Sequence, residues 1–314
     1  MIEHKRVAVL DLGTNTFNLV IASQNSGDRF EILHSSKIPV KLGEGGINSG
    51  EIIPAAYQRG IDAVDRHFSM IKSFGAEKIF AFGTSALRTA DNGIKFINQI
   101  RQNTGIDVEI ISGDREAELI YYGVRQTLNM TDEKYLILDI GGGSNEFIIA
   151  DKDKIFWKKS FKLGIARILE KYKPSDPILT GEILEIEKYV KNSLSELDEK
   201  VKELKVKTLI GASGSFETFV TMIREIDITE ETLSATVPRS IPIDLDDFDH
   251  LCQRLILSTH EQRKEMIGLE PMRIEMIVLA ALFVKFILEM LGIKSMIQSN
   301  FSLKEGVIYQ LFKS

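Results

Sequence analysis

Short apolar runs alternate along this chain with longer segments in which apolar side chains recur every three or four positions. The short runs, such as residues 7–10, 136–138 and 147–150, predict buried β-strands. The longer segments predict amphipathic helices. The clearest of them, residues 180–204, has apolar side chains at Ile183, Ile186, Val190, Leu194, Leu197, Val201 and Leu204. Strands and helices that alternate in this way predict an α/β protein.

One strand–turn–strand pattern occurs twice. Residues 7–22 align without gaps on residues 135–150, and Asp11 then matches Asp139. In each copy an apolar strand ends at this aspartate, a turn of small residues follows, and a second apolar strand begins. Turn chemistry alone does not dictate such length and order. The repeat therefore predicts a duplicated domain with a cleft between the two copies.

The turn of the second copy, residues 141–145, contains three consecutive glycines. Without Cβ atoms, its backbone N–H groups can close around an anion. Asp139 precedes the turn and Glu146 follows it, so two carboxylates flank this group of donors. A phosphate needs hydrogen-bond donors, and a divalent cation beside it needs carboxylate oxygens. This turn offers both.

Three further places contain candidate binding residues. Residues 83–92 combine small hydroxyl side chains with Arg88 one turn later, which suits an anion, although Arg88 taken alone is better read as an exposed helix charge. Glu116 lies in the first turn of a predicted helix, where the helix dipole favours a carboxylate. Composition alone does not separate a functional carboxylate from one that only stabilises the start of the helix. Ser213 and Gly214 lie where a strand meets a helix N-terminus, a third potential anion site unless the glycine serves close packing.

Length and charge restrict the organisation and the partners. The 314 residues suit two domains, and the best boundary gives a first half, residues 1–124, and a second half, residues 125–314, whose last helix can pack back on the first. The net charge of −6 provides no global positive field, so we expect no nucleic-acid partner. The basic segment 152–173 is interpreted as a solvated face rather than a polyanion track.

Cysteine content and hydropathy indicate the compartment. The single cysteine, Cys252, excludes a disulfide within the chain and fits a reducing compartment. The longest apolar stretch, residues 276–284, is too short to span a bilayer. Residues 1–6 run directly into a core strand without a signal peptide. We therefore expect a cytoplasmic protein without a membrane partner, and a homodimer stays open.

The two hairpins and the glycine–serine turn, in this order, resemble the actin-like ATPase superfold of duplicated ribonuclease H-like domains with an interdomain cleft. Within that superfold, the chain is similar to the exopolyphosphatase / guanosine pentaphosphate phosphohydrolase (Ppx/GppA phosphatase) family in its short two-domain form. The segments that carry this resemblance are residues 11–16, 84–92, 111–121, 139–144, 160–167, 211–215 and 302–306.

The resemblance implies a phosphoric anhydride hydrolase that removes terminal phosphate from inorganic polyphosphate or guanosine pentaphosphate with Mg²⁺ or Mn²⁺. Glu116 matches the family's catalytic glutamate, the base that activates the attacking water. Asp139 and Glu146 match acidic residues around the cation, and Asp11 lies in the equivalent turn of the first half. The residues expected to contact phosphate are Thr14, Asn15, Gly141, Gly142, Gly143, Ser144, Asn145, Arg88, Ser213 and Gly214, with Arg273 as a chain or nucleotide contact.

Two other functions remain as alternatives. A sugar or acetate kinase of the same superfold would need an adenosine pocket, and the segments around Glu116 and residues 84–92 favour hydrolysis instead. A non-catalytic sensor of the alarmone or of polyphosphate would not need Glu116, Asp139 and Glu146 together. One position departs from the family pattern, because Asn18 stands where many relatives have arginine or histidine.

Overall fold

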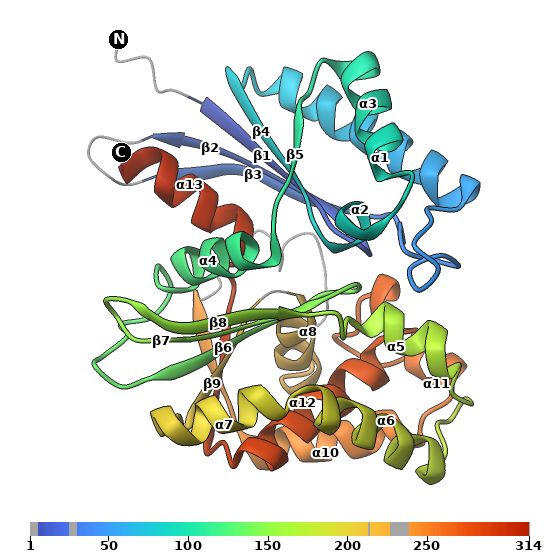
Figure 1. Ribbon diagram of the computed structural model, residues 1–314, viewed down its shortest axis with the longest axis vertical. Coiled ribbons are helices and arrows are strands. Elements are labelled where there is room, and N and C mark those ends of the chain that lie inside the picture. The colour runs from blue at the N-terminus through green and yellow to red at the C-terminus, as the bar shows by residue number, and fades with distance from the viewer. Residues whose placement is uncertain (1–5, 25–29, 213, 227–238, 314) are drawn as a thin grey trace.

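The computed structural model describes residues 6–24, 30–212, 214–226 and 239–313. Within this part of the chain, two mixed β-sheets lie one above the other with helices on their faces (Figure 1). The first sheet contains, in spatial order, β3 (Phe30–Pro39), β2 (Thr16–Gln24), β1 (Arg6–Leu12), β4 (Lys78–Gly83) and β5 (Val108–Ile110). The second contains β10 (Ser240–Ile243), β11 (Ser295–Ser299), β9 (Thr208–Ala212), β6 (Tyr135–Ile140), β7 (Asn145–Ala150) and β8 (Ile155–Phe161).

The two hairpins predicted as a repeat have the same register. β1 pairs antiparallel with β2 so that Asp11 faces Asn18, and β6 pairs with β7 so that Asp139 faces Glu146. Each first strand also pairs in parallel with a later strand of its own half, β1 with β4 and β6 with β9. The predicted duplicated α/β plan is therefore present. Asp11 and Asp139 lie at corresponding strand ends in the two sheets.

Helices cover the outer faces of both sheets (Figure 1). On the first sheet these are α1 (Pro54–Ser73) and α3 (Gly93–Thr104), with the short α2 (Ser85–Thr89) beside them. On the second sheet they are α5 (Ile165–Tyr172), α6 (Thr180–Ser193), α7 (Ser195–Leu204), α8 (Gly214–Ile223), α10 (Leu245–Leu257) and α12 (Ile277–Leu291). The second half also contains two shorter pieces, α11 (His260–Lys264) and the 3₁₀ turn η1 (Pro271–Arg273).

Two helices lie between the sheets, α4 (Gly113–Val124) and α13 (Leu303–Lys313) (Figure 1). Their apolar side chains form one cluster with the inner faces of both sheets. The two helices pack closely, because a Cβ on Gly123 would lie 2.0 Å from the carbonyl oxygen of Ser302, and one on Gly306 would lie 1.8 Å from that of Leu119. Glycine at both positions therefore determines how α13 sits on α4.

The last helix also contacts the first sheet. α13 packs against β1, β2 and β3 as well as against α4. We propose that the domains divide between α4 and β6, into residues 1–124 and 125–314, and that α13 returns from the end of the chain to the first domain.

One predicted helix is wrong in detail. Residues 180–204 form two helices, α6 and α7, that meet at Leu194. Leu194 has φ −110° and ψ 18°, outside the helical region, and its side chain is completely buried. The apolar periodicity continues across this break, because both helices bury the same face.

The apolar segment near residue 280 forms the buried helix α12, nearly all of whose side chains lie in the core of the second half. Among the described helices, none is both long enough and apolar enough to cross a membrane.

Candidate active site

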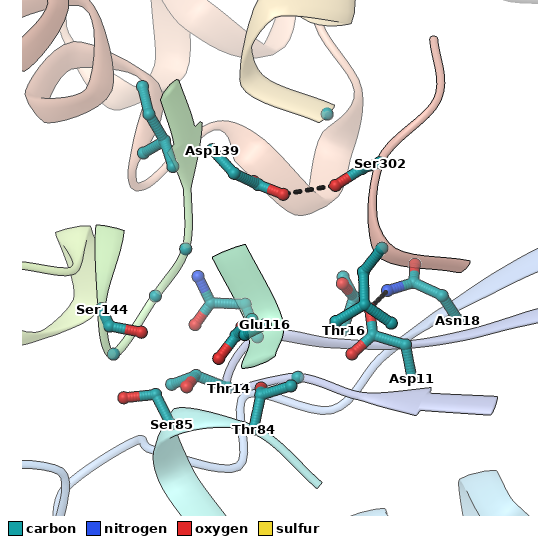
Figure 2. Close-up of a pocket in the computed structure, with 18 of the residues that line it drawn as sticks. Asp11, Thr14, Thr16, Asn18, Thr84, Ser85, Glu116, Asp139, Ser144 and Ser302 are labelled. Carbon is teal, nitrogen blue, oxygen red and sulfur yellow. Dashed lines mark hydrogen bonds between the residues drawn. The ribbon is translucent and has the colours of Figure 1, made fainter. Parts of the chain in front are cut away.

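A cavity of about 120 Å³, hereafter the central cavity, opens where the turn after β1 faces the turn after β6 (Figure 2). Both halves and the start of α13 contribute to it. Its lining residues are Asp11, Gly13, Thr14, Asn15, Thr16, Asn18, Thr84, Ser85, Glu116, Asp139, Ile140, Gly141, Gly142, Gly143, Ser144, Glu146, Gly214, Arg273, Ser302, Leu303 and Lys304. Of the predicted site residues, Arg88 and Asn145 do not line the central cavity, and Ser213 lies outside the described residues.

Glu116 lies near the middle of the site in the view of Figure 2. It belongs to the first turn of α4, whose N-cap Ser112 accepts a hydrogen bond from the Arg115 N–H at 3.1 Å. The side chain is only 10% exposed. Arg88 Nη1 donates to Glu116 Oε2 at 3.0 Å and to the carbonyl oxygen of Ile111 at 2.8 Å. Arg88 thus holds the carboxylate of Glu116 rather than lining the cavity.

The glycine turn between β6 and β7 directs its N–H groups away from α5. The Ile165 and Ala166 N–H groups of α5 donate to the carbonyl oxygens of Gly141 and Gly142, at 3.0 and 2.9 Å. Because the carbonyl and the N–H of one peptide plane point in opposite directions, the N–H groups of Gly142 and Gly143 lie on the other side of the turn. Both glycines line the central cavity, so these donors are available to an anion.

Asn145 shapes this turn from behind. Its side chain is completely buried, its Oδ1 accepts a hydrogen bond from the Gly141 N–H at 3.1 Å, and its Nδ2 donates to the carbonyl oxygen of Leu163 at 2.9 Å. The Gly141 N–H is therefore occupied within the turn. Asn145 acts on a ligand only through the shape of the turn.

The two predicted phosphate loops touch each other. A Cβ on Gly142 would lie 2.5 Å from Asn15 Oδ1, and a Cβ on Gly143 would lie 2.6 Å from Ser85 Oγ and 2.7 Å from Thr14 Oγ1. The glycines are thus required because side chains of the first half occupy that space. Ser85 Oγ is buried and has no hydrogen-bond partner among the described residues, so a hydroxyl is free to contact a ligand in the central cavity.

Four carboxylates surround the central cavity, and one oxygen of each accepts a hydrogen bond. The bonds are Asn18 Nδ2 to Asp11 Oδ2 at 2.9 Å, Arg88 Nη1 to Glu116 Oε2 at 3.0 Å, Ser302 Oγ to Asp139 Oδ2 at 2.5 Å, and Ser144 Oγ and Ser160 Oγ to Glu146 Oε1 at 2.7 and 2.6 Å. Figure 2 shows the bond of Asn18 to Asp11 and that of Ser302 to Asp139. The other oxygen of each carboxylate accepts no hydrogen bond from the described residues.

Burial raises the pKa of all four carboxyl groups above the usual range. The pKa of Asp139 is raised to about 7, mainly by burial and also by the negative charges of Glu146 and Asp11, against the hydrogen bond from Ser302 and the charge of Lys304. The pKa of Glu116 is raised first by burial and then by the charge of Glu146, against the charge of Arg88. The carboxylates therefore repel one another, and a bound cation would stabilise their ionised forms.

The donor set fits a cation that is bound together with phosphate. Among the described residues, no three acidic, histidine or cysteine side chains lie close enough to form a ready-made metal cage. Mg²⁺ usually takes only one or two carboxylates and completes its shell with water and substrate phosphate oxygens. Asp11, Asp139 and Glu146 all line the central cavity, and each keeps one oxygen that accepts no hydrogen bond from the described residues.

Two arginines of the second half take different places. Arg273 lines the central cavity, donates from Nε to Glu270 Oε2 at 2.8 Å, and covers Gly214 so closely that a Cβ there would lie 1.7 Å from Nη2. Arg167, in the basic segment interpreted as a solvated face, is instead partly buried. It donates from Nε to the carbonyl oxygen of Gly143 at 2.7 Å and from Nη2 to Thr89 Oγ1 at 3.1 Å, and so joins the glycine turn to the first half.

Several cavity residues were not predicted individually. Thr84 and Ser85 belong to the hydroxyl-rich segment, and Ser302 and Lys304 belong to the last segment of the family pattern. The sequence signal was therefore present for each segment. Which side chain of a segment enters the cavity depends on the helix phase and on the packing of α13.

Comparison with known proteins agrees with this geometry. The sequence model of the Ppx/GppA phosphatase family matches residues 20–314. Exopolyphosphatase 1 of Mycobacterium tuberculosis is 26% identical over 98% of this chain and 89% of that protein. The guanosine-5'-triphosphate,3'-diphosphate pyrophosphatase of Photobacterium profundum is 29% identical over 97% of this chain, which spans 59% of that protein's length.

Solved structures of exopolyphosphatases and of Ppx/GppA proteins are also similar to this chain. The crystal structure of an exopolyphosphatase from Cytophaga hutchinsonii has a TM-score of 0.92 and 35% identity, with 98% of both chains covered. The Aquifex aeolicus member of the Ppx/GppA family has a TM-score of 0.78 at 22% identity, which establishes the fold alone. The predicted actin-like ATPase fold of two domains is confirmed. The chain belongs to the Ppx/GppA phosphatase family.

Proposed function

We propose that the protein is an exopolyphosphatase that hydrolyses the terminal phosphoanhydride bond of inorganic polyphosphate, with guanosine pentaphosphate as a second substrate. One observation carries the proposal: the buried carboxylate of Glu116 faces a cavity that contains both an anion-binding turn and three further carboxylates. A kinase or a sensor does not require this combination. The relatives named above are hydrolases of phosphate chains or of phosphorylated guanosine, which supports the same assignment.

In this proposal, one group of cavity residues binds the terminal phosphate and Glu116 activates the attacking water. The N–H groups of Gly142 and Gly143 and the hydroxyl of Ser85 bind the terminal phosphate. Glu116 accepts a proton from a water molecule as the water oxygen bonds to the terminal phosphorus and the bridging P–O bond breaks. The products are inorganic phosphate and a chain shorter by one phosphate. The raised pKa of Glu116 suits a base, because the proton acceptor works best near the operating pH.

A divalent cation, Mg²⁺ or Mn²⁺, is part of the proposal. Asp139, Glu146 and Asp11 would hold it. When bound, it neutralises negative charge on the phosphate oxygens, which is the main electrostatic requirement of phosphoryl transfer. A cytoplasmic location, expected from the composition and the single buried cysteine Cys252, belongs to the same proposal.

The direct test is phosphate release by the purified protein. We expect release from long-chain polyphosphate and from tripolyphosphate with Mg²⁺, slower release from guanosine pentaphosphate, and none from either chain with excess chelator. If none of the three substrates released phosphate, either with Mg²⁺ or with Mn²⁺, the proposed function would be refuted. Transfer of phosphate to a sugar or to acetate, rather than to water, would favour the kinase.

The glycine turn provides a sharper structural test. Gly164 precedes α5, and a Cβ there would lie 2.2 Å from the carbonyl oxygen of Gly142 and 2.4 Å from the Gly143 N. Gly164→Ala should therefore displace the turn and lower kcat/KM for polyphosphate at least about tenfold, the scale of one lost phosphate contact. The measurement is steady-state phosphate release.

Gly181→Ala is the matched control, because a Cβ at Gly181 meets nothing within 4 Å. This variant should keep full activity and a free energy of unfolding at least as high as that of the wild type. Equal activity of the two variants would show that the position of the turn does not limit the reaction.

A further inference from the structure

Lys304 is a cation that lines the central cavity and donates no hydrogen bond to any residue that the structure describes. It is the second residue of α13, its side chain is 18% exposed, and it lines the cavity. Its nearest carboxylate oxygen, Glu305 Oε1, lies 4.0 Å from Nζ, beyond hydrogen-bond distance. The other oxygen of Glu305 accepts from the Ser302 N–H at 2.9 Å. Within the described residues, the Lys304 ammonium donates no hydrogen bond.

This arrangement is costly unless a ligand completes it. An ammonium has three donors, and removing them from water without acceptors is unfavourable. Burial lowers the pKa of Lys304, but the negative charges of Glu305, Asp11 and Glu217 raise it above its usual value, so the side chain stays charged. A phosphate oxygen would supply the missing acceptor.

Two other cations near the central cavity, Arg273 and Arg88, already donate to carboxylates of the protein. Of the two cationic side chains that line the central cavity, Arg273 donates to Glu270, and only Lys304 lacks an acceptor among the described residues. Arg88 is bonded to Glu116 from outside the cavity. A polyanionic chain that enters among four carboxylates needs a positive contact of this kind.

Lys304 lies at the start of α13, and Figure 2 shows Ser302 of that segment on the other side of the cavity from Ser85 and Ser144 of the two phosphate-binding segments. Ser302 Oγ donates to Asp139 Oδ2 at 2.5 Å, and Gly306 packs closely on α4, so the start of α13 cannot move freely. A phosphate chain whose terminal group is held by the glycine turn can therefore extend toward the start of α13 with its next phosphate, which is the leaving group of the displacement.

We propose that Lys304 binds the substrate by donating to an oxygen of the penultimate phosphate, the leaving group of the reaction. The inference rests on the proposed hydrolysis of a phosphate chain. It assigns the terminal phosphate to the glycine turn and the next phosphate to the start of α13, where the helix dipole also favours an anion.

The test is a binding measurement that does not need turnover. Calorimetry would compare inorganic phosphate with a methylene-bridged analogue of tripolyphosphate, each with Mg²⁺ and with chelator. Lys304→Met should weaken binding of the analogue by about 10- to 100-fold, the range of a charge-assisted hydrogen bond, and leave binding of inorganic phosphate unchanged. Lys304→Arg should restore most of the affinity, and Lys304→Gln serves if the methionine variant fails to fold.

Lys313→Met is the control, since Lys313 lies on the same helix and is exposed. Unchanged affinity of Lys304→Met for the analogue would overturn the inference, as would an equal loss for inorganic phosphate. Tighter Mg²⁺ binding with unchanged analogue binding would show that Lys304 is only a counter-ion of the carboxylates. Phosphate release by the wild-type protein tests the function separately, so the two failures are distinguishable.

Discussion

Replacement of Glu116 by glutamine should lower kcat for phosphate release by about 10²–10⁴-fold, the usual scale of general-base catalysis. The amide keeps the size of the side chain, and its carbonyl oxygen can still accept the hydrogen bond from Arg88. It cannot accept the proton of the attacking water. Because this proton transfer occurs in the transition state, substrate affinity should change little or increase. Steady-state kinetics with polyphosphate and binding of a non-hydrolysable chain separate the two effects.

Glu118→Gln is the internal control for this prediction. Glu118 lies two residues further along α4, and its carboxylate pairs with Arg115 at 2.8 Å rather than lining the central cavity. Its replacement should leave kcat within about twofold, as expected for a surface ion pair. Near-normal kcat of Glu116→Gln, or a larger loss in Glu118→Gln, would mean that the base is another residue.

Replacement of Asp139 by asparagine should raise the Mg²⁺ concentration needed for half-maximal activity at least about tenfold and lower kcat by about 10²-fold, the scale of lost metal or second-shell contacts. The amide preserves the hydrogen bond from Ser302 and removes only a negative charge. The same change reduces the repulsion among the buried carboxylates. Binding of inorganic phosphate without metal should therefore tighten, while catalysis weakens.

Asp151→Asn provides the comparison for Asp139. Asp151 is a buried aspartate just beyond β7, and its Oδ1 accepts hydrogen bonds from the Asp153 and Lys154 N–H groups at 2.8 and 2.9 Å, away from the central cavity. Its replacement is expected to lower stability without changing the Mg²⁺ dependence. Full wild-type activity in excess chelator would refute the metal requirement altogether, whatever the variants do.

The sequence alone determined the duplicated plan of the protein. Strand register follows from the alternation of side chains and from turn length, and both properties lie within about 16 contiguous residues of each hairpin. Asp11 and Asp139 could therefore be placed at equivalent strand ends. That Glu116 and Glu146 meet them in one cavity followed from the family resemblance, because no local pattern connects β7 with α4.

Local sequence patterns did not predict the break in a helix or the direction of a polar side chain in a turn, because packing decides both. The apolar stripe of residues 180–204 is continuous, yet the helix breaks at Leu194, since periodicity records the buried face and not the backbone angle. Asn145 stands in an anion-binding motif, but its amide points into the protein and holds the turn. A polar side chain in such a turn can face either way, and only its neighbours decide.

Tertiary structure alone decided the partners of the charged groups. Arg88 and Glu116 are 28 residues apart, and Ser302 and Asp139 are 163 residues apart, so neither hydrogen bond has a local sequence signal. Lys304 reads in the sequence as part of an ordinary helix start. Among the described residues its ammonium donates no hydrogen bond, although it lies among carboxylates. It reaches this position because Gly123 and Gly306 let α13 pack closely on α4, which places the start of α13 at the cavity between the two repeated hairpins.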